Sequence, residues 1–157
     1  MASVTVSLVI PAPRDEVWAV ISDVANARRW NASWTRIEII TEQTQGKGTR
    51  FRTHNRETDD TFEFEISEWT APEYIAFAPM RDPEERRYDI SLDWHAFRLA
   101  PEEGGKTRVD LTASASTRGI RGRFVGMVFW PGHQRAGLTQ ALRSLGEVFG
   151  MEAEEAT

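Results

Sequence analysis

Seven alternating segments, followed by one long helical segment, constrain the fold of this chain most strongly. The predicted strands cover residues 3–10, 34–43, 48–57, 61–70, 73–79, 86–100 and 106–117. Apolar side chains recur at every second position, as in Val4, Val6 and Leu8, which is the period of a half-buried strand. Turns as short as residues 71–73 favour antiparallel neighbours, because parallel strands need long crossovers.

The closing segment, residues 119–150, predicts one long helix with an apolar seam. The seam comprises Ile120, Phe124, Met127, Leu138, Leu142, Leu145 and Phe149. Their steps are mostly three or four residues, as one helix face requires. Pro131 lies inside the segment and predicts a kink or break, because proline removes a backbone hydrogen bond and clashes with the preceding turn. The seam keeps its phase through Pro131, which favours one bent helix.

Two short helical segments follow the first strand. Pro13 can occupy a first helical turn, and Asp15 and Glu16 favour its positive end. A second helical turn is expected at residues 26–30. Seven strands and one long helix cannot stack as a sandwich, so an α+β fold is predicted in which the sheet curls around the helix. Such a grip leaves space between sheet and helix.

Composition bounds the class of protein. The 157 residues fit a single domain, expected at residues 1–152, with a disordered tail at 153–157. No cysteine is present, which excludes disulfides and thiolate chemistry and suits a cytoplasmic protein. The net charge of −5 argues against nucleic-acid binding, and no apolar run is long enough to span a membrane.

The charge is distributed unevenly. Residues 118–150 carry five arginines against one glutamate, so this segment is basic in an acidic chain. A solvated helix face is one explanation. A surface that meets an acidic lipid, ligand or partner is the other.

Several stretches resemble one known superfamily. They are IPAPRDEVWAVISDVANARRWN at 10–31, Phe51 in GTRFR, Pro72 in ISEWTAPEYIAF, WHAFRLAPEEGGKTRVDLTAS, and the Arg-bearing last helix with its internal proline. Over nearly its whole length the chain resembles the START-like, or SRPBCC, superfamily, which includes polyketide cyclase/dehydrase-like proteins. The resemblance implies the helix-grip (START/Bet v 1-like) fold: a seven-stranded curved antiparallel sheet around a long C-terminal helix. The superfamily includes lipid and hormone carriers, polyketide cyclases, chaperone activators and hydroxylase domains, so no single chemistry follows.

Large aromatic rings are the candidate walls of an internal cavity, although each could also fill the core. On the third strand, alternation turns Phe51, Thr53 and Asn55 inward. The expected ligand-binding residues are Trp30, Trp34, Phe51, Thr53, Asn55, Phe62, Phe64, Phe77, Phe97, Phe129 and Trp130.

The segment 86–100 offers the candidate catalytic residues and allows two phases. Strict alternation from Phe97 places Asp93 and His95 inside, as a polar pocket pair. A β-bulge near residues 94–96 would instead turn Ile90, Leu92 and Trp94 inward. His133, next to Pro131, is the reserve candidate.

Motifs for other chemistries are missing from the sequence. The histidines at 54, 95 and 133 have no metal-ligand spacing, so no bound metal is expected. No phosphate-binding glycine loop or nucleophile elbow occurs, and no cofactor is expected.

Three functions stay open at this point. The first is binding of a small hydrophobic, lipid- or polyketide-like molecule in the cavity. The second is a polyketide cyclase or dehydratase that uses the polar pair, and the third is an interaction protein of the chaperone-activator kind. A monomer or a homodimer is expected, and a small hydrophobic molecule is the expected partner.

Overall fold

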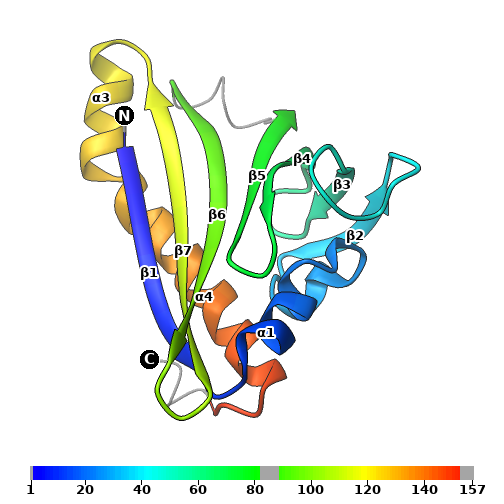
Figure 1. Ribbon diagram of the computed structural model, residues 1–157. Coiled ribbons are helices and arrows are strands. Elements are labelled where there is room, and N and C mark those ends of the chain that lie inside the picture. Colours follow the sequence, from blue (N-terminus) through cyan, green and yellow to red (C-terminus); the bar gives the residue numbers. More distant parts are fainter. Residues whose placement is uncertain (1, 82–88, 153–157) are drawn as a thin grey trace.

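A computed structural model describes residues 2–81 and 89–152, and the expected tail at 153–157 lies outside the described residues (Figure 1). In chain order the elements are β1 (Ala2–Ile10), α1 (Arg14–Ile21), the 3₁₀ helix η1 (Val24–Arg29), β2 (Trp34–Ile39), β3 (Arg50–Asn55), β4 (Thr61–Thr70), β5 (Tyr74–Arg81), β6 (Ile90–Glu102), β7 (Lys106–Thr117), α3 (Gly119–Val128) and α4 (Trp130–Val148). All seven predicted strands and both short helices are therefore present. No helix among the described residues has the length and apolarity needed to cross a bilayer.

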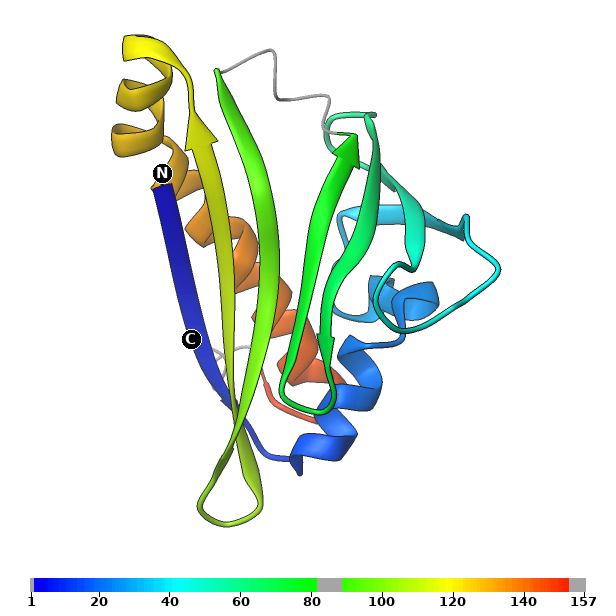
Figure 2. The ribbon, with the colours of Figure 1, turned by 45° about the horizontal axis from the view of Figure 1, so that its top comes forward.

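The strands form one antiparallel sheet in the order β1-β7-β6-β5-β4-β3-β2. The sheet curves, and α4 crosses one of its faces, behind β7 and β6 in Figure 1. Turned by 45°, the molecule shows α1 beside the lower end of α4, near the β4–β5 hairpin (Figure 2). The predicted helix-grip class is confirmed.

The core lies between this inner face of the sheet and α4. On β7 the inward residues Val109, Leu111 and Ala113 are buried, and they alternate with polar residues. Leu142 and Leu145 of α4 are also buried against the sheet. Each buried valine or leucine contributes about 1.5–3 kcal/mol of hydrophobic stabilisation. The seam predicted for the C-terminal half of the last helix is confirmed.

The last helical segment breaks where the proline predicts a disruption. The break falls at Phe129, and Pro131 lies in the first turn of α4, where its missing N–H costs little. The segment is divided into α3 and α4 by Phe129 alone, and the backbone of Phe129 stays in the α-helical region, so the predicted kink or break is confirmed.

In α3, the first half of the last helical segment, the predicted apolar seam faces solvent and not the sheet. Ile120, Phe124 and Met127 are 89%, 55% and 78% exposed, so they point away from the sheet. Gly122 and Gly126 are buried on the opposite side of α3. Helical period shows which residues share a face, but close packing of the glycines against the sheet decides which face is buried.

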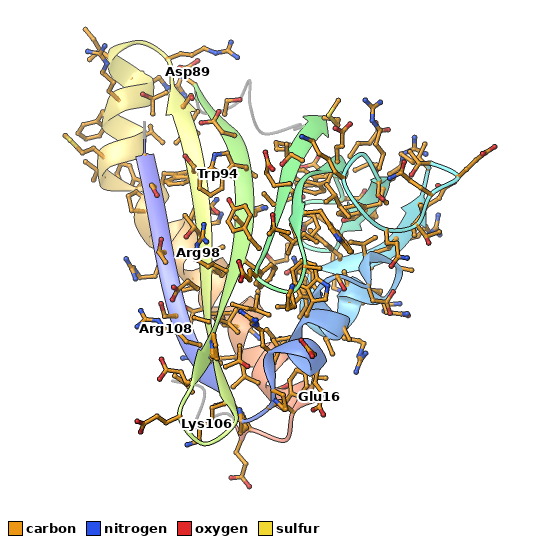
Figure 3. All side chains as sticks on the ribbon, viewed as in Figure 1. Glu16, Asp89, Trp94, Arg98, Lys106 and Arg108 are labelled. Carbon is orange, nitrogen blue, oxygen red and sulfur yellow. The ribbon has the colours of Figure 1, made fainter. Side chains whose placement is uncertain are left out.

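A β-bulge in β6 sets the phase of the candidate catalytic residues. Leu92 pairs with Ala115 and Trp94 pairs with Ser114, which leaves Asp93 as the extra residue. Because paired residues share a face, Leu92 lies on the inner face with Ala115. Trp94 lies on the outer face, away from α4 (Figure 3). The predicted bulge therefore exists, but it lies one residue earlier than expected, and the expectation that it turns Trp94 inward was wrong.

Candidate functional site

A hollow of about 390 Å³ lies between the sheet, the loop after η1 and the middle of α4. Its apolar wall includes Trp30, Phe77, Phe97, Leu111 and Leu138. The wall follows from strand register, because Phe97 pairs with Leu111 across β6 and β7 and both lie on the inner face. This hollow is the space that a sheet curled around a helix was expected to leave.

A second hollow, of about 420 Å³, adjoins the first near the break between α3 and α4. Its apolar wall includes Phe62, Phe64, Leu92, Phe129 and Trp130. The two hollows share seven lining residues: Asn31, Trp34, Asn55, Glu57, His95, His133 and Gln134. A ligand at this junction can extend into either hollow.

Edge-to-face and tilted rings make the wall rigid. Trp30 meets Trp34 with ring centroids 5.4 Å apart and meets Phe97 at 5.1 Å, both edge to face. Trp34 packs in turn on Phe64, at 5.6 Å. Such contacts add about 0.5–1.5 kcal/mol each beyond burial of the ring area. These contacts therefore support one another along the apolar wall.

His95 lies at the junction of the two hollows. It pairs with Phe77 on β5 and with Ala113 on β7, which places its ring on the inner face. Burial disfavours the imidazolium form and lowers the pKa of His95 to about 4. Within the described part of the chain, no hydrogen-bond or ionic partner is found for the ring. His95 is therefore a neutral imidazole whose hydrogen-bonding capacity is available to a ligand.

Asp93 does not belong to this site. Its carboxylate accepts a hydrogen bond from the Ser116 hydroxyl at 2.8 Å, near solvent. Neither hollow is lined by Asp93. Asp93 is the extra residue of the bulge, whereas His95 follows the regular alternation after it. The expectation that Asp93 and His95 form an inward pair was therefore wrong.

The shared junction carries further polar groups. Asn55, at the end of β3, accepts backbone N–H bonds from Glu57 and Thr58 through its side-chain oxygen, which fixes the loop there. His133 is exposed in the first turns of α4, and its side chain lines both hollows. Both residues were predicted, whereas Glu57, Asn31 and Gln134 were missed because loop and helix-start residues follow no apolar period.

Two buried polar atoms in this region have no hydrogen-bond partner. The Trp30 indole Nε1 is one, and Trp30 lines the first hollow. The Thr53 hydroxyl is the other, but Thr53 lines neither hollow. Leaving a buried donor unpaired costs about 1–3 kcal/mol. The Trp30 N–H is therefore an unpaired buried donor in a residue of the cavity wall.

Nine of the eleven predicted ligand-binding residues line one of the two hollows. Phe51 and Thr53 are the exceptions. Phe51 is fully buried and stacks on Phe64 with ring centroids 5.6 Å apart, so it supports the wall from behind. Inward orientation was predicted for both residues, but alternation does not show how many layers lie between a side chain and the cavity.

The lining of the two hollows contains an acidic side chain and histidines. No lysine or arginine among the described residues lines either hollow. The ionisable groups that do so are His95, His133 and Glu57. No group of three or more metal-ligating side chains occurs in residues 2–81 and 89–152.

A curved antiparallel sheet closed by a C-terminal helix over a preformed apolar hollow defines a helix-grip protein. The family model described as "Polyketide cyclase / dehydrase and lipid transport" matches residues 1–150, and the chain belongs to this family. The resemblance noted in the sequence is thereby confirmed.

Solved structures with the same fold share little sequence with this chain. XoxI from Bacillus cereus is 14% identical, with a TM-score of 0.74 over 95% of this chain and 96% of that one. A protein from Nitrosospira multiformis is 16% identical, with a TM-score of 0.73 over 97% and 99%. The Aha1 dimer from Colwellia psychrerythraea is 15% identical, with a TM-score of 0.68 over 96% and 98%. A search of curated proteins finds no match. These likenesses concern the fold alone.

Proposed function

We propose that this chain binds a small, uncharged, apolar molecule that carries at least one oxygen atom, and that the molecule occupies the two adjoining hollows. The observation that carries the proposal is an aromatic and aliphatic lining without lysine or arginine among the described residues. A carboxylate or phosphate buried there would have no cation to pair with, which costs several kcal/mol. Glu57 at the junction would repel it further. Lipid- or polyketide-like molecules without a charged group fit the lining.

The oxygen atom follows from the two unpartnered groups. The Trp30 N–H can donate to a ketone or hydroxyl oxygen. The neutral His95 ring can accept from a hydroxyl or donate to a carbonyl, depending on its tautomer. A few polar groups in an apolar wall are the usual means of orienting a ligand. Hollows of about 390 and 420 Å³ suit a molecule of about two to four fused rings.

Catalysis of the cyclase or dehydratase kind is a second candidate, since two histidines line both hollows. His95 and His133 could hold and move protons on a bound polyketide-like substrate. A conjugate acid with a pKa of about 4 makes His95 a weak base at neutral pH, however, and efficient general bases have a pKa near the working pH. The site therefore favours binding over proton abstraction by His95.

An interaction protein without a ligand is the third reading of the fold. It requires a filled interior, and six tryptophans and eight phenylalanines could have supplied one. Two hollows of ligand size weigh against it.

A pair of matched probes tests the proposal. 2-Acetylnaphthalene and 2-naphthoate have nearly the same shape, but only the second is an anion at neutral pH. Quenching of tryptophan fluorescence should show the ketone binding at least about tenfold more tightly, because the carboxylate loses hydration without gaining a cation. Ala141→Phe, which narrows the first hollow, should weaken ketone binding, whereas Ala25→Phe on the exposed side of η1 should not. Equal affinity for both probes, or no binding of the ketone, would overturn the proposal.

A further inference from the structure

A helix that packs on a sheet usually buries its large apolar side chains, but helix α3 exposes them. Its buried side consists of Gly122 and Gly126. A β-carbon on Gly126 would lie 2.7 Å from Thr117 Cγ2, so the backbone of α3 rests directly on the end of the sheet. The large side chains point outward: Ile120, Phe124, Met127, Val128 and the following Phe129, with exposures of 51–89%. Figure 1 shows α3 at one end of the molecule, beside the upper ends of β1 and β7.

The outward side chains form one continuous stripe. At about 100° per residue, Ile120, Phe124, Met127 and Val128 all fall within about 100° of one another around the helix axis, so they lie on one helix face. Phe124 and Phe129 pack edge to face, with ring centroids 6.0 Å apart. A contiguous exposed apolar patch of this kind marks an interaction surface.

Two arginines flank the stripe. Successive residues of an α-helix are about 100° apart, so Arg121 and Arg123 lie on opposite sides of it. The Arg121 side chain is 73% exposed, and its only described acidic neighbour is Asp89, with 3.8 Å from Nε to Oδ2. Exposed pairs of this kind contribute little. Residues 118–129 contain three arginines and no acidic residue, in a chain whose net charge is −5.

We propose that α3 docks on the anionic surface of a lipid bilayer. An apolar stripe bordered by arginines on both sides is the pattern of a helix that lies in the bilayer interface, with its apolar side chains among the acyl chains and its cations among the headgroups. Val125, Phe129 and Trp130 also line the second hollow, so docking would bring the rim of that hollow to the bilayer. The docking does not require the ligand proposed above.

A second copy of the chain fits this surface less well. Two stripes placed face to face would bring the arginines of both copies together, and like charges in an interface are costly. One ten-residue helix also offers little area for a stable dimer, which commonly buries more than about 1,000 Å². The charge of the surface therefore favours lipid.

Sedimentation with phospholipid vesicles tests the proposal on the full chain. Binding is expected to vesicles of phosphatidylcholine with about 30 mol % phosphatidylglycerol, and to be much weaker with phosphatidylcholine alone. Raising the salt from about 0.05 to about 0.5 M should weaken the binding, because the arginine contribution is screened. Absence of binding to the anionic vesicles would overturn the proposal.

Paired variants assign the binding to α3. Phe124→Ser with Met127→Ser should lower the partition coefficient about tenfold or more, because two inserted apolar groups are lost. Ile40→Ser with Met80→Ser removes side chains of similar exposure elsewhere and should leave it unchanged. Neither Phe124 nor Met127 lines a hollow, so ketone binding serves as the test of correct folding.

Variants that remove two arginines, and a measurement of self-association, complete the design. Arg121→Gln with Arg123→Gln should weaken binding several-fold, whereas Arg28→Gln with Arg29→Gln, an equal loss of exposed charge on η1, should not. Equal effects of these two double variants on vesicle binding would overturn the assignment to α3. Sedimentation equilibrium without lipid should show a monomer, and a dimer abolished by the Phe124 and Met127 changes would identify a second copy as the occupant instead.

Discussion

Gly122 lies so close to Asp89 that a β-carbon on the glycine would overlap the Asp89 carbonyl oxygen. That carbonyl also accepts a hydrogen bond from the backbone N–H of Arg118, at 2.8 Å. The start of α3 is therefore held against the beginning of β6 at a contact that admits only glycine. This contact turns the bulky side chains of α3 toward solvent.

Gly122→Ala should destabilise the protein by about 1–3 kcal/mol, because the helix must move away from backbone atoms that cannot yield. Chemical denaturation measures the change. Gly137→Ala in α4 is the matched control, since nothing lies within 4 Å of the added β-carbon. That control should stabilise the protein by up to about 1 kcal/mol through helix propensity. Similar effects of the two substitutions would contradict the close contact.

Leu145→Ala and Ile120→Ala should differ sharply, although both positions belong to the seam predicted from sequence. Leu145 is fully buried, so truncation should cost about 2–5 kcal/mol of unfolding free energy. Ile120 is 89% exposed, and its truncation should change stability by less than about 0.5 kcal/mol. Denaturant melts of the two variants measure this, and a large loss for Ile120→Ala would place α3 against the sheet after all.

These two helices show what the sequence could determine. The period of three and four residues identified Leu138, Leu142 and Leu145 as buried residues of α4, and Pro131 predicted the disruption between α3 and α4. The orientation of α3 could not follow from that period, because it depends on which neighbouring face the helix meets. One signal was present: Gly122 and Gly126 lie four residues apart, and small residues at that spacing permit close approach of a backbone.

The bulge in β6 limited the prediction of the site in another way. Strict alternation, one of the two phases left open, turned His95 inward with Phe97, and the other phase turned Leu92 inward; the structure shows both orientations. The position of the extra residue, Asp93, is fixed by pairing with β7, which is a long-range property. A local pattern therefore allowed two phases, and each applies to one part of the strand.

The stability of the protein should fall in acid partly through His95. Its pKa is lowered from 6.5 to about 4 by burial, so the unfolded state takes up the proton first as the pH falls. The stability from the neutral ring is complete above about pH 6.5 and is lost between there and about pH 4. The loss should approach about 2–3 kcal/mol at the acid end, the smaller value if water enters the hollow.

His95→Gln isolates this contribution, because the other ionisable groups are common to both proteins. The difference in unfolding free energy between wild type and His95→Gln should change by about 2–3 kcal/mol from pH 7 to pH 4. A difference that stays constant with pH would show that the His95 ring titrates normally.

Trp30→Phe should weaken binding of 2-acetylnaphthalene about three- to tenfold, because the ketone loses the indole N–H. The smaller ring also changes the shape of the wall. Naphthalene, which has no oxygen, reports that change alone, so its affinity should fall much less. Fluorescence titration of both probes gives the comparison, and equal losses would show that Trp30 contributes only shape.

The three histidines provide the most direct test of the binding site. His95 lies at the junction of the hollows, His133 lies at their exposed edge, and His54 is on the outer face, with Nε2 2.8 Å from the Asp59 carboxylate. In an NMR spectrum of the histidine rings, 2-acetylnaphthalene should shift the His95 signals strongly and leave those of His54 unchanged. Binding of the ketone with unmoved His95 signals, or with His54 shifted as far as His95, would contradict a ligand held between the sheet and α4.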